Sequence, residues 1–204
     1  MSYPVELEVD YPERLSRWLN NPFLLWIKWI LIIPHYIIVA AYQYLATALT
    51  FIASFAILFT GRYPAGMFNL VAGYLRWQVR MYGYMLALRD DYPPFSNGDE
   101  PGYPLRLKIE RPEHLSRWLN NPFLFWIKWL LAIPHFIVIA LYAIAAVIVW
   151  YIALWAIMFT GRYPRGMYNF NVGLARWAYR LNTYLLLMTD RYPPFSGKPS
   201  AEIS

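Results

Sequence analysis

Each of the two long apolar runs of this sequence contains one histidine, His35 or His135, directly after a proline. An imidazole inside a membrane can ligate haem iron or the magnesium of a chlorophyll. A haem or pigment carrier is therefore one hypothesis. The alternative is that each imidazole bonds a backbone carbonyl freed by the proline, or lies among interfacial aromatic rings. Neither histidine has a second ligand or a cofactor-attachment motif beside it, which favours the structural role and predicts no cofactor.

Four arginines form two pairs with the same spacing: Arg76 and Arg80, Arg176 and Arg180. Members of a pair are one helical turn apart, so both guanidinium groups can reach one phosphate. With Lys28 or Lys128 entering from the headgroup level, each half of the chain is predicted to hold an anionic phospholipid. Two alternatives remain open: the arginines line an anion path in an oligomer, or they snorkel from a shallow interfacial helix.

The other polar residues form no catalytic pattern. The chain has no Cys, which excludes disulfides and thiolate metal sites. The GRYPRG segment at 161–166 lacks the lysine and the strand–helix context of a phosphate loop. The acidic residues lie in polar segments without a carboxylate pair that spacing would bring together. We therefore predict no enzymatic activity and no metal site.

These residues belong to a duplicated unit. Aligning 11–96 with 111–196, without a gap, gives 49 identical positions, which indicates two repeats, 1–100 and 101–204. The chain is 59% hydrophobic and 15% charged, which favours a membrane protein over a soluble one. The net charge of +6 comes from basic residues beside apolar runs. That position favours lipid headgroups over nucleic acid as partners.

The apolar runs, 23–60 and 123–160, have one charge each and no Gly. About 20 apolar residues in a helix cross a bilayer, so each run is long enough. A hairpin of two short spans would need a turn near 41–46, where Gly, Pro and Asn are absent. We therefore expect one helix per run, opened by Asn21 before Pro22 and kinked at Pro34. Its first third would lie oblique or in the interface, and the rest would cross.

A second helix is predicted over 66–90 and again over 166–190. Spacings of three and four align small and polar residues with the arginines on one face: Gly66, Asn69, Gly73, Arg76, Arg80, Gly83, Ala87 and Asp90. Small residues in such a stripe suit close helix packing, and the arginines should turn away from lipid. Reading both segments as spans gives four crossings, both repeats in one orientation, and cytoplasmic termini. The alternative is that they lie flat in the interface.

Each repeat also begins with a segment of strand-like alternation, 3–10 and 103–110. The outward residues are acidic in the first and basic in the second: Glu6 and Glu8, Arg106 and Lys108. If a two-fold axis relates the repeats, these segments can pair so that acid faces base. The alternative is two extended linkers that do not meet. The predicted fold class is all-α integral membrane, two tandem repeats with a short β-segment each.

Recurring motifs complete the unit: RLSRW, IPH, FTGRYP, and YPPF. In this combination the chain resembles an uncharacterised family of bacterial integral-membrane proteins, classed as a domain of unknown function, whose unit of roughly 100 residues occurs singly or duplicated. The resemblance covers both repeats almost end to end. It implies a location and an architecture, but no substrate, cofactor or catalytic residue.

From these features we expect a non-catalytic structural or accessory subunit of a larger bacterial membrane assembly, in the inner membrane and multi-pass. Its partners would be phospholipids and other membrane subunits or further copies of itself. The abundance of aromatic and small-residue packing surface without a reaction centre motivates this expectation. The alternatives are an oligomeric anion channel or transporter, and a haem or chlorophyll-type carrier.

Overall fold

The structure is a computed structural model that describes residues 3–124 and 126–199. Four helices and two strands follow one another in the order β1 (Val5–Val9), α1 (Leu25–Thr60), α2 (Ala65–Met85), β2 (Leu105–Ile109), α3 (Trp126–Thr160) and α4 (Arg165–Leu185). The mostly helical architecture with a short β-segment at the start of each repeat agrees with the helical, two-repeat part of the predicted fold class.

The long helices α1 and α3 each run unbroken through their internal proline, Pro34 and Pro134. At 1.5 Å per residue, the 36 residues of α1 extend over about 54 Å. Both are long and apolar enough to cross a membrane. The predicted cap is wrong, because α1 begins at Leu25; Asn21 instead closes a preceding turn through its Oδ1, which accepts from the Phe23 N–H at 2.9 Å.

The second helix of each repeat is shorter than predicted, because α2 ends at Met85. The chain turns at Ala87, which has a positive φ of 57°, as has its equivalent Leu187 at 60°. Two non-glycine residues in this left-handed region carry a modest conformational cost. The turn reverses the chain and brings Asp90 back to the beginning of α1.

The strands β1 and β2 pair antiparallel, with Leu7 opposite Leu107 at the centre. Glu6 faces Lys108 and Glu8 faces Arg106, so the prediction that acid faces base is confirmed. Lys108 Nζ lies 3.0 Å from a Glu8 carboxylate oxygen. The hydrogen bond from Lys108 is the main reason that the pKa of Glu8 lies below its ordinary value. We call this two-stranded sheet the ribbon.

The repeats exchange their first segments across the ribbon. β2 packs on α2, while β1 packs on α4. The exchange extends past the strands, since the Leu15 N–H donates to the Gly161 carbonyl at 2.9 Å and the Leu115 N–H donates to the Gly61 carbonyl at 2.8 Å. These reciprocal contacts relate the repeats by an approximate two-fold axis.

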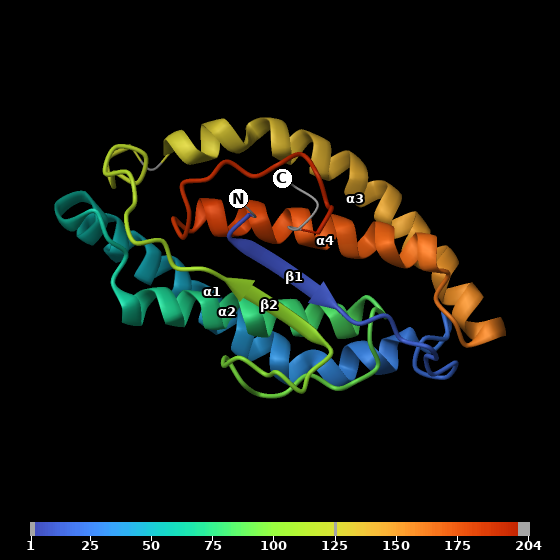
Figure 1. Cartoon of the computed structure of the whole chain (residues 1–204). Coiled ribbons are helices and arrows are strands. Elements are labelled where there is room, and N and C mark those ends of the chain that lie inside the picture. The colour runs from blue at the N-terminus through green and yellow to red at the C-terminus, as the bar shows by residue number, and fades with distance from the viewer. Residues whose placement is uncertain (1–2, 125, 200–204) are drawn as a thin grey trace.

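Because of that axis, α1 and α3 run in opposite directions along the molecule (Figure 1). The expectation that both repeats share one orientation is therefore wrong. Hydropathy along a sequence carries no information about the relative direction of two similar repeats, and the antiparallel strand pair imposes it here.

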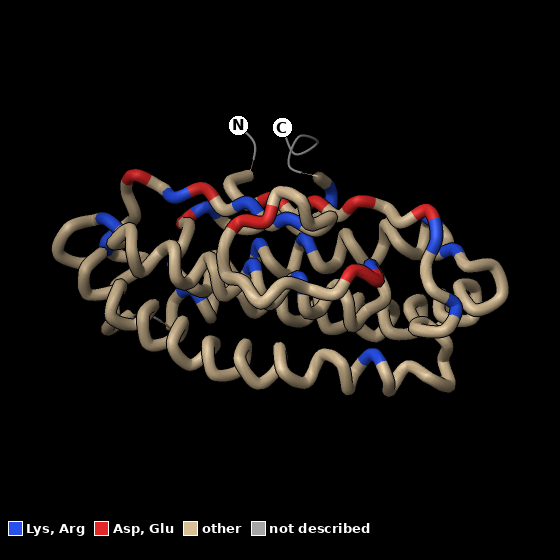
Figure 2. Tube along the Cα trace, turned by 90° about the horizontal axis from the view of Figure 1, so that it is seen from below, with Lys and Arg blue, Asp and Glu red and all other residues tan. Residues whose placement is uncertain are grey.

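The elements form layers. The ribbon lies over α2 and α4, and charged residues gather along the ribbon side of the molecule, whereas the opposite side is nearly free of them (Figure 2). Ribbon residues such as Val5, Leu7, Leu105 and Leu107 turn one face into the core and are at most 2% exposed. The other face carries the charges.

Candidate functional site

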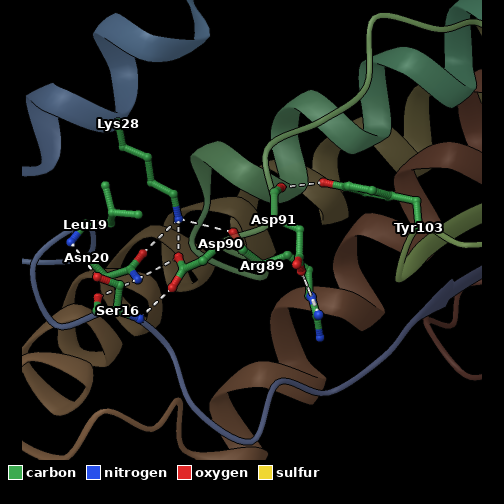
Figure 3. Close-up of polar contacts among 8 residues, drawn as sticks. All are labelled: Ser16, Leu19, Asn20, Lys28, Arg89, Asp90, Asp91 and Tyr103. Carbon is green, nitrogen blue, oxygen red and sulfur yellow. Dashed lines mark hydrogen bonds and ion pairs between the residues drawn. The ribbon is translucent and has the colours of Figure 1, made fainter.

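A buried polar network joins the beginning of α1 to the segment after α2 (Figure 3). The Lys28 side chain is fully buried, and its Nζ donates to Asp90 Oδ1 at 2.8 Å and to Asn20 Oδ1 at 2.9 Å. It also donates to the Arg89 carbonyl at 3.2 Å and lies over the ring of Tyr84, 4.5 Å from the centroid. Every donor of the ammonium group thus has an internal partner.

Asp90 is the centre of this network. One carboxylate oxygen accepts from Lys28 and from Asn20 Nδ2, the latter at 2.8 Å. The other accepts from the Ser16 N–H at 2.5 Å. Residues before α1 and in its first turn therefore meet the distant Asp90 on one carboxylate, and the burial of the lysine charge is compensated by ion pairing and hydrogen bonds.

The second repeat reproduces the network with one difference. Lys128 Nζ donates to the Thr189 carbonyl at 2.8 Å and lies 3.2 Å from Asp190 Oδ1. Asn120 still donates to Asp190 at 2.7 Å, but its own Oδ1 is buried without a hydrogen-bond partner in the described chain. Sequence reasoning missed these asparagines and aspartates as site residues. The available signal was the recurrence of WLNNPF and of Asp two residues before YPPF.

The four stripe arginines are held by backbone carbonyls. Arg76 donates to the Leu107 carbonyl at 3.3 Å, and Arg176 donates to the Leu7 carbonyl at 3.0 Å. Each of these arginines therefore bonds the strand that the other repeat contributes. Both arginines thus lie under the ribbon, and the expectation that they turn away from lipid stays a prediction.

The second arginine of each pair holds the chain after the YPPF motif. Arg80 donates to the carbonyls of Ser96, at 3.3 Å, and of Gly98. Arg180 donates to those of Ser196, at 3.0 Å, and Lys198, at 2.8 Å. Both arginines are at most 2% exposed. Lipid binding by this stripe and by Lys28 and Lys128 stays a prediction, and the internal partners weaken its physical basis.

The small residues of the stripe let extended segments of the chain, rather than another helix, pack closely against α2. A Cβ on Gly83 would lie 2.3 Å from Leu105 Cδ1 of β2, and one on Gly73 would lie 2.9 Å from the Asn97 carbonyl oxygen. The interpretation of the stripe as a surface for close helix packing is therefore wrong. Spacing identifies the face correctly, but it does not reveal what covers that face.

The two intrahelical histidines lie among aromatic rings, as one of the alternatives predicts. His35 Nδ1 accepts from Trp77 Nε1 at 2.9 Å, and the imidazole stacks on Phe95 at 3.8 Å between centroids. His135 has the same arrangement with Trp177 and Phe195. Since Nδ1 accepts a hydrogen bond, Nε2 carries the proton of the neutral ring. A metal would need the lone pair of that nitrogen, so this geometry gives the cofactor hypothesis no support.

The outer surface of α1 and α3 is apolar over most of its length. Nine residues of α1 and six residues of α3 are buried. The large side chains left exposed begin at Trp26 and end at Phe59 in α1, and extend from Trp126 to Phe159 in α3. We call this surface the apolar face. Soluble monomers rarely expose a contiguous apolar area of this extent.

Exposed arginines surround the junction where the repeats meet. A hollow of about 360 Å³ is lined by Arg14, Arg17 and Arg162, together with backbone near Gly161. No acidic side chain is among its lining residues. Trp18, next to Arg17, is 75% exposed. Arginine beside exposed tryptophan is typical of the headgroup level of a membrane.

Comparison with protein families gives a match to the same family model in each of the two repeats. The family model described as "Domain of unknown function (DUF4389)" matches residues 24–97 and 124–197, one copy in each predicted repeat. Neither a curated protein nor a solved structure matches the chain. The matched ranges contain both the network lysines and the YPPF motifs.

Proposed function

We propose that this chain, which belongs to the DUF4389 family of unknown function, is a non-catalytic membrane component that lies flat in one leaflet. The apolar face of α1 and α3 would contact the acyl chains, and the ribbon would face water. In this position it would serve as a structural or accessory subunit of a membrane assembly, as the composition suggests. The separation of the charged ribbon from the apolar face carries the proposal (Figure 2).

The flat arrangement follows from the two-fold relation of the repeats. If α1 crossed a bilayer, α3 would cross beside it in the opposite direction, and the ribbon between them would lie near the middle of the hydrocarbon. The ribbon carries Glu6, Glu8, Arg106 and Lys108 on its outer face. Each charge at that depth costs at least about 2.5 kcal/mol. Turning the molecule flat moves all of them into water at no cost to the fold.

Lipid suits the apolar face better than a second protein copy. Exposed tryptophans lie at the beginning of each long helix and just before it: Trp18, Trp26, Trp29, Trp118, Trp126 and Trp129. Tryptophan concentrates at the boundary between headgroups and acyl chains. Its location at the end regions of the apolar face, with large aliphatic residues between, matches a helix pair lying at this boundary.

Labelling of single cysteines distinguishes the flat arrangement from four crossings. The natural chain has no Cys, so variants such as Glu13→Cys, Arg62→Cys and Arg162→Cys have no background. All three positions are exposed. In a flat protein, a membrane-impermeant maleimide should label all three from the same side of the inner membrane. The Leu15–Gly161 hydrogen bond joins the segments that contain Glu13 and Arg162, so these two positions lie on the same side of a membrane in either arrangement.

If the helices of this fold crossed the bilayer, Arg62 would react from the side opposite Glu13 and Arg162, and this result would overturn the proposal. Ile37→Cys and Ile137→Cys provide the control for burial in lipid, since both residues are more than half exposed in the isolated chain. They should resist the reagent until detergent is added. Rapid labelling of both in intact membranes would indicate that water, rather than lipid, covers the apolar face.

The arginines at the junction are the better candidates for contact with anionic headgroups. Arg14, Arg17 and Arg162 are exposed and have no acidic neighbour in their hollow. A basic residue near an anionic surface contributes about 1 kcal/mol. Changing all three to Gln should therefore weaken binding to phosphatidylglycerol vesicles by tenfold or more at low salt. Arg111→Gln, another exposed arginine, is the single-charge control; an equal loss in that variant would refute a localised site.

A further inference from the structure

We propose that the cavity between the two repeats is a binding site for an uncharged lipid whose head group carries hydroxyls, such as a monoacylglycerol. The cavity has a volume of about 440 Å³, within the range of small-molecule sites. It lies between the second half of α1, the middle of α2 and the parts of the second repeat that approach them: Trp129 of α3, Asn182 and Leu185 of α4, and Leu186 and Leu187 just after α4. The proposed function enters only as the route of access, from the embedded leaflet.

The wall of the cavity combines an apolar entrance with a polar interior. Phe51 and Trp129 line it and are 55% and 51% exposed, so they stand where the cavity meets the apolar face. Thr50 and Ser54 line it and are buried. An amphipathic molecule can therefore enter with its polar end first and leave its chain against the aromatic side chains.

The polar groups inside present both hydrogen-bond acceptors and donors. The hydroxyls of Thr47, Thr50 and Ser54 donate their protons to backbone carbonyls at 2.9, 2.8 and 2.6 Å. Their oxygen lone pairs remain to accept. Gln78 Nε2 donates to the Tyr74 hydroxyl at 2.5 Å, which leaves Gln78 Oε1 to accept and the Tyr74 O–H to donate. The side-chain amides of Gln43 and Asn182 also line the cavity and can donate and accept. A head group with several hydroxyls, each of which both donates and accepts, matches this set.

The cavity lining contains no charged side chain. A carboxylate or phosphate brought into it would lose hydration without a cation to replace it, and an ammonium group would find no carboxylate. Burial of an isolated charge is far more costly than burial of a hydroxyl that finds a partner. The head group is therefore uncharged.

The second repeat supplies an internal comparison. Five polar cavity residues of the first repeat have apolar equivalents exactly 100 positions later: Gln43 and Ala143, Thr47 and Val147, Thr50 and Trp150, Ser54 and Leu154, Gln78 and Ala178. Trp150 packs against the second core, and its buried Nε1 has no hydrogen-bond partner in the described chain. An indole thus occupies the position where the first repeat has small hydroxyls. The first repeat lines this cavity with five polar side chains, whereas the second repeat has apolar residues at the equivalent positions. A purely structural role of the repeats does not require this difference.

A photoactivatable monoacylglycerol with a diazirine in its acyl chain tests the site in purified, detergent-solubilised full-length protein. Crosslinks should map to peptides that contain Phe51, Trp129 or Leu186. Thr50→Trp, which installs the residue of the second repeat, should reduce crosslinking at least tenfold without lowering the melting temperature. Thr50→Val and Gln78→Ala, which remove acceptors and keep the cavity, should reduce it severalfold.

Two comparisons make the outcome decisive. Tyr44→Trp adds an indole at an exposed position of α1 that does not line the cavity, and should leave crosslinking unchanged. Unlabelled monoacylglycerol should compete, and a fatty acid with the same chain should not. Equal competition by the fatty acid, or crosslinking that Thr50→Trp does not reduce, would overturn the proposal. Since the assay is in detergent, a flat or a crossing arrangement in the bilayer does not affect its result.

Discussion

At the scale of single residues, the ion pair of Lys28 with Asp90 joins the beginning of α1 to the chain after α2 in the first repeat. Changing Asp90 to Asn would leave a fully buried ammonium group with neutral partners only. We expect a loss of about 3 kcal/mol in the free energy of unfolding, because breaking a buried pair on one side strands the other charge. Thermal unfolding in detergent measures it. Lys28→Met combined with Asp90→Asn should recover part of the loss; a double variant that is less stable than Asp90→Asn would contradict this account.

The histidines allow a second prediction at this scale. Trp77→Phe removes the indole N–H that donates a hydrogen bond to His35 Nδ1. The substitution should lower the free energy of unfolding by about 1–3 kcal/mol, because a buried acceptor loses its partner. Trp177→Phe provides the matched case in the second repeat. Protein purified from its native membranes should show no visible absorption band. A band that disappears in a His35→Ala variant would instead support the cofactor hypothesis.

At the scale of elements, the approach of β2 to α2 depends on one glycine. Gly83→Ala would place a methyl group 2.3 Å from Leu105 Cδ1, and overpacking of this kind costs about 1–3 kcal/mol. The equivalent positions of the other half are Thr183 and Val5, a larger helix residue and a smaller strand residue. Leu105→Val should therefore restore much of the stability lost in Gly83→Ala.

Gly66 is the control for this substitution, because a Cβ there would meet nothing within 4 Å. Gly66→Ala should leave stability unchanged or raise it by up to about 1 kcal/mol through helix propensity. Equal destabilisation by both substitutions, measured by thermal unfolding, would show that the contact with Leu105 is not the cause.

The ribbon makes stability depend on pH in a defined range. Lys108 holds the pKa of Glu8 below its ordinary value of 4.5. The paired carboxylate therefore contributes its full stabilisation above pH 4.5 and loses it as the pH falls through the lowered pKa. Glu8→Gln should flatten the part of the stability profile below pH 4.5 that this group causes. An unchanged slope in that variant would assign the acid sensitivity to other carboxylates.

The sequence allowed the elements to be predicted better than their partners. The long apolar helices, the second helices and the acid–base pairing of the strands all follow from periodicity and charge. The partners of the arginines do not, since spacing puts Arg76 and Arg80 on one face without revealing that strand and loop carbonyls cover it. The network around Asp90 depends on the turn at Ala87, where a non-glycine residue with positive φ leaves no trace in composition.

At the scale of the whole molecule, the exchanged strands make each repeat incomplete by itself. β1 covers α4 and β2 covers α2, so a separated repeat would expose both a helix and an unpaired strand. When the halves 1–100 and 101–204 are produced together as separate chains, we expect them to associate in a 1:1 complex that survives detergent size exclusion. Failure to associate, with both halves soluble in detergent and folded, would contradict the exchange.

The opposite charges of the two strands also determine which copies can recognise each other. In the observed register Glu6 and Glu8 meet Lys108 and Arg106; two first repeats brought together in the same way would oppose Glu6 to Glu8, and two second repeats would oppose Arg106 to Lys108. Like charges directly opposite destabilise a strand pair. A protein with a single repeat would have to pair its strand with that of a second copy. The two repeats of this chain instead carry strands of opposite charge, which pair with each other. Both partners of the strand pair are thus present on one chain, and neighbouring copies of the protein can remain separate without exchanging strands.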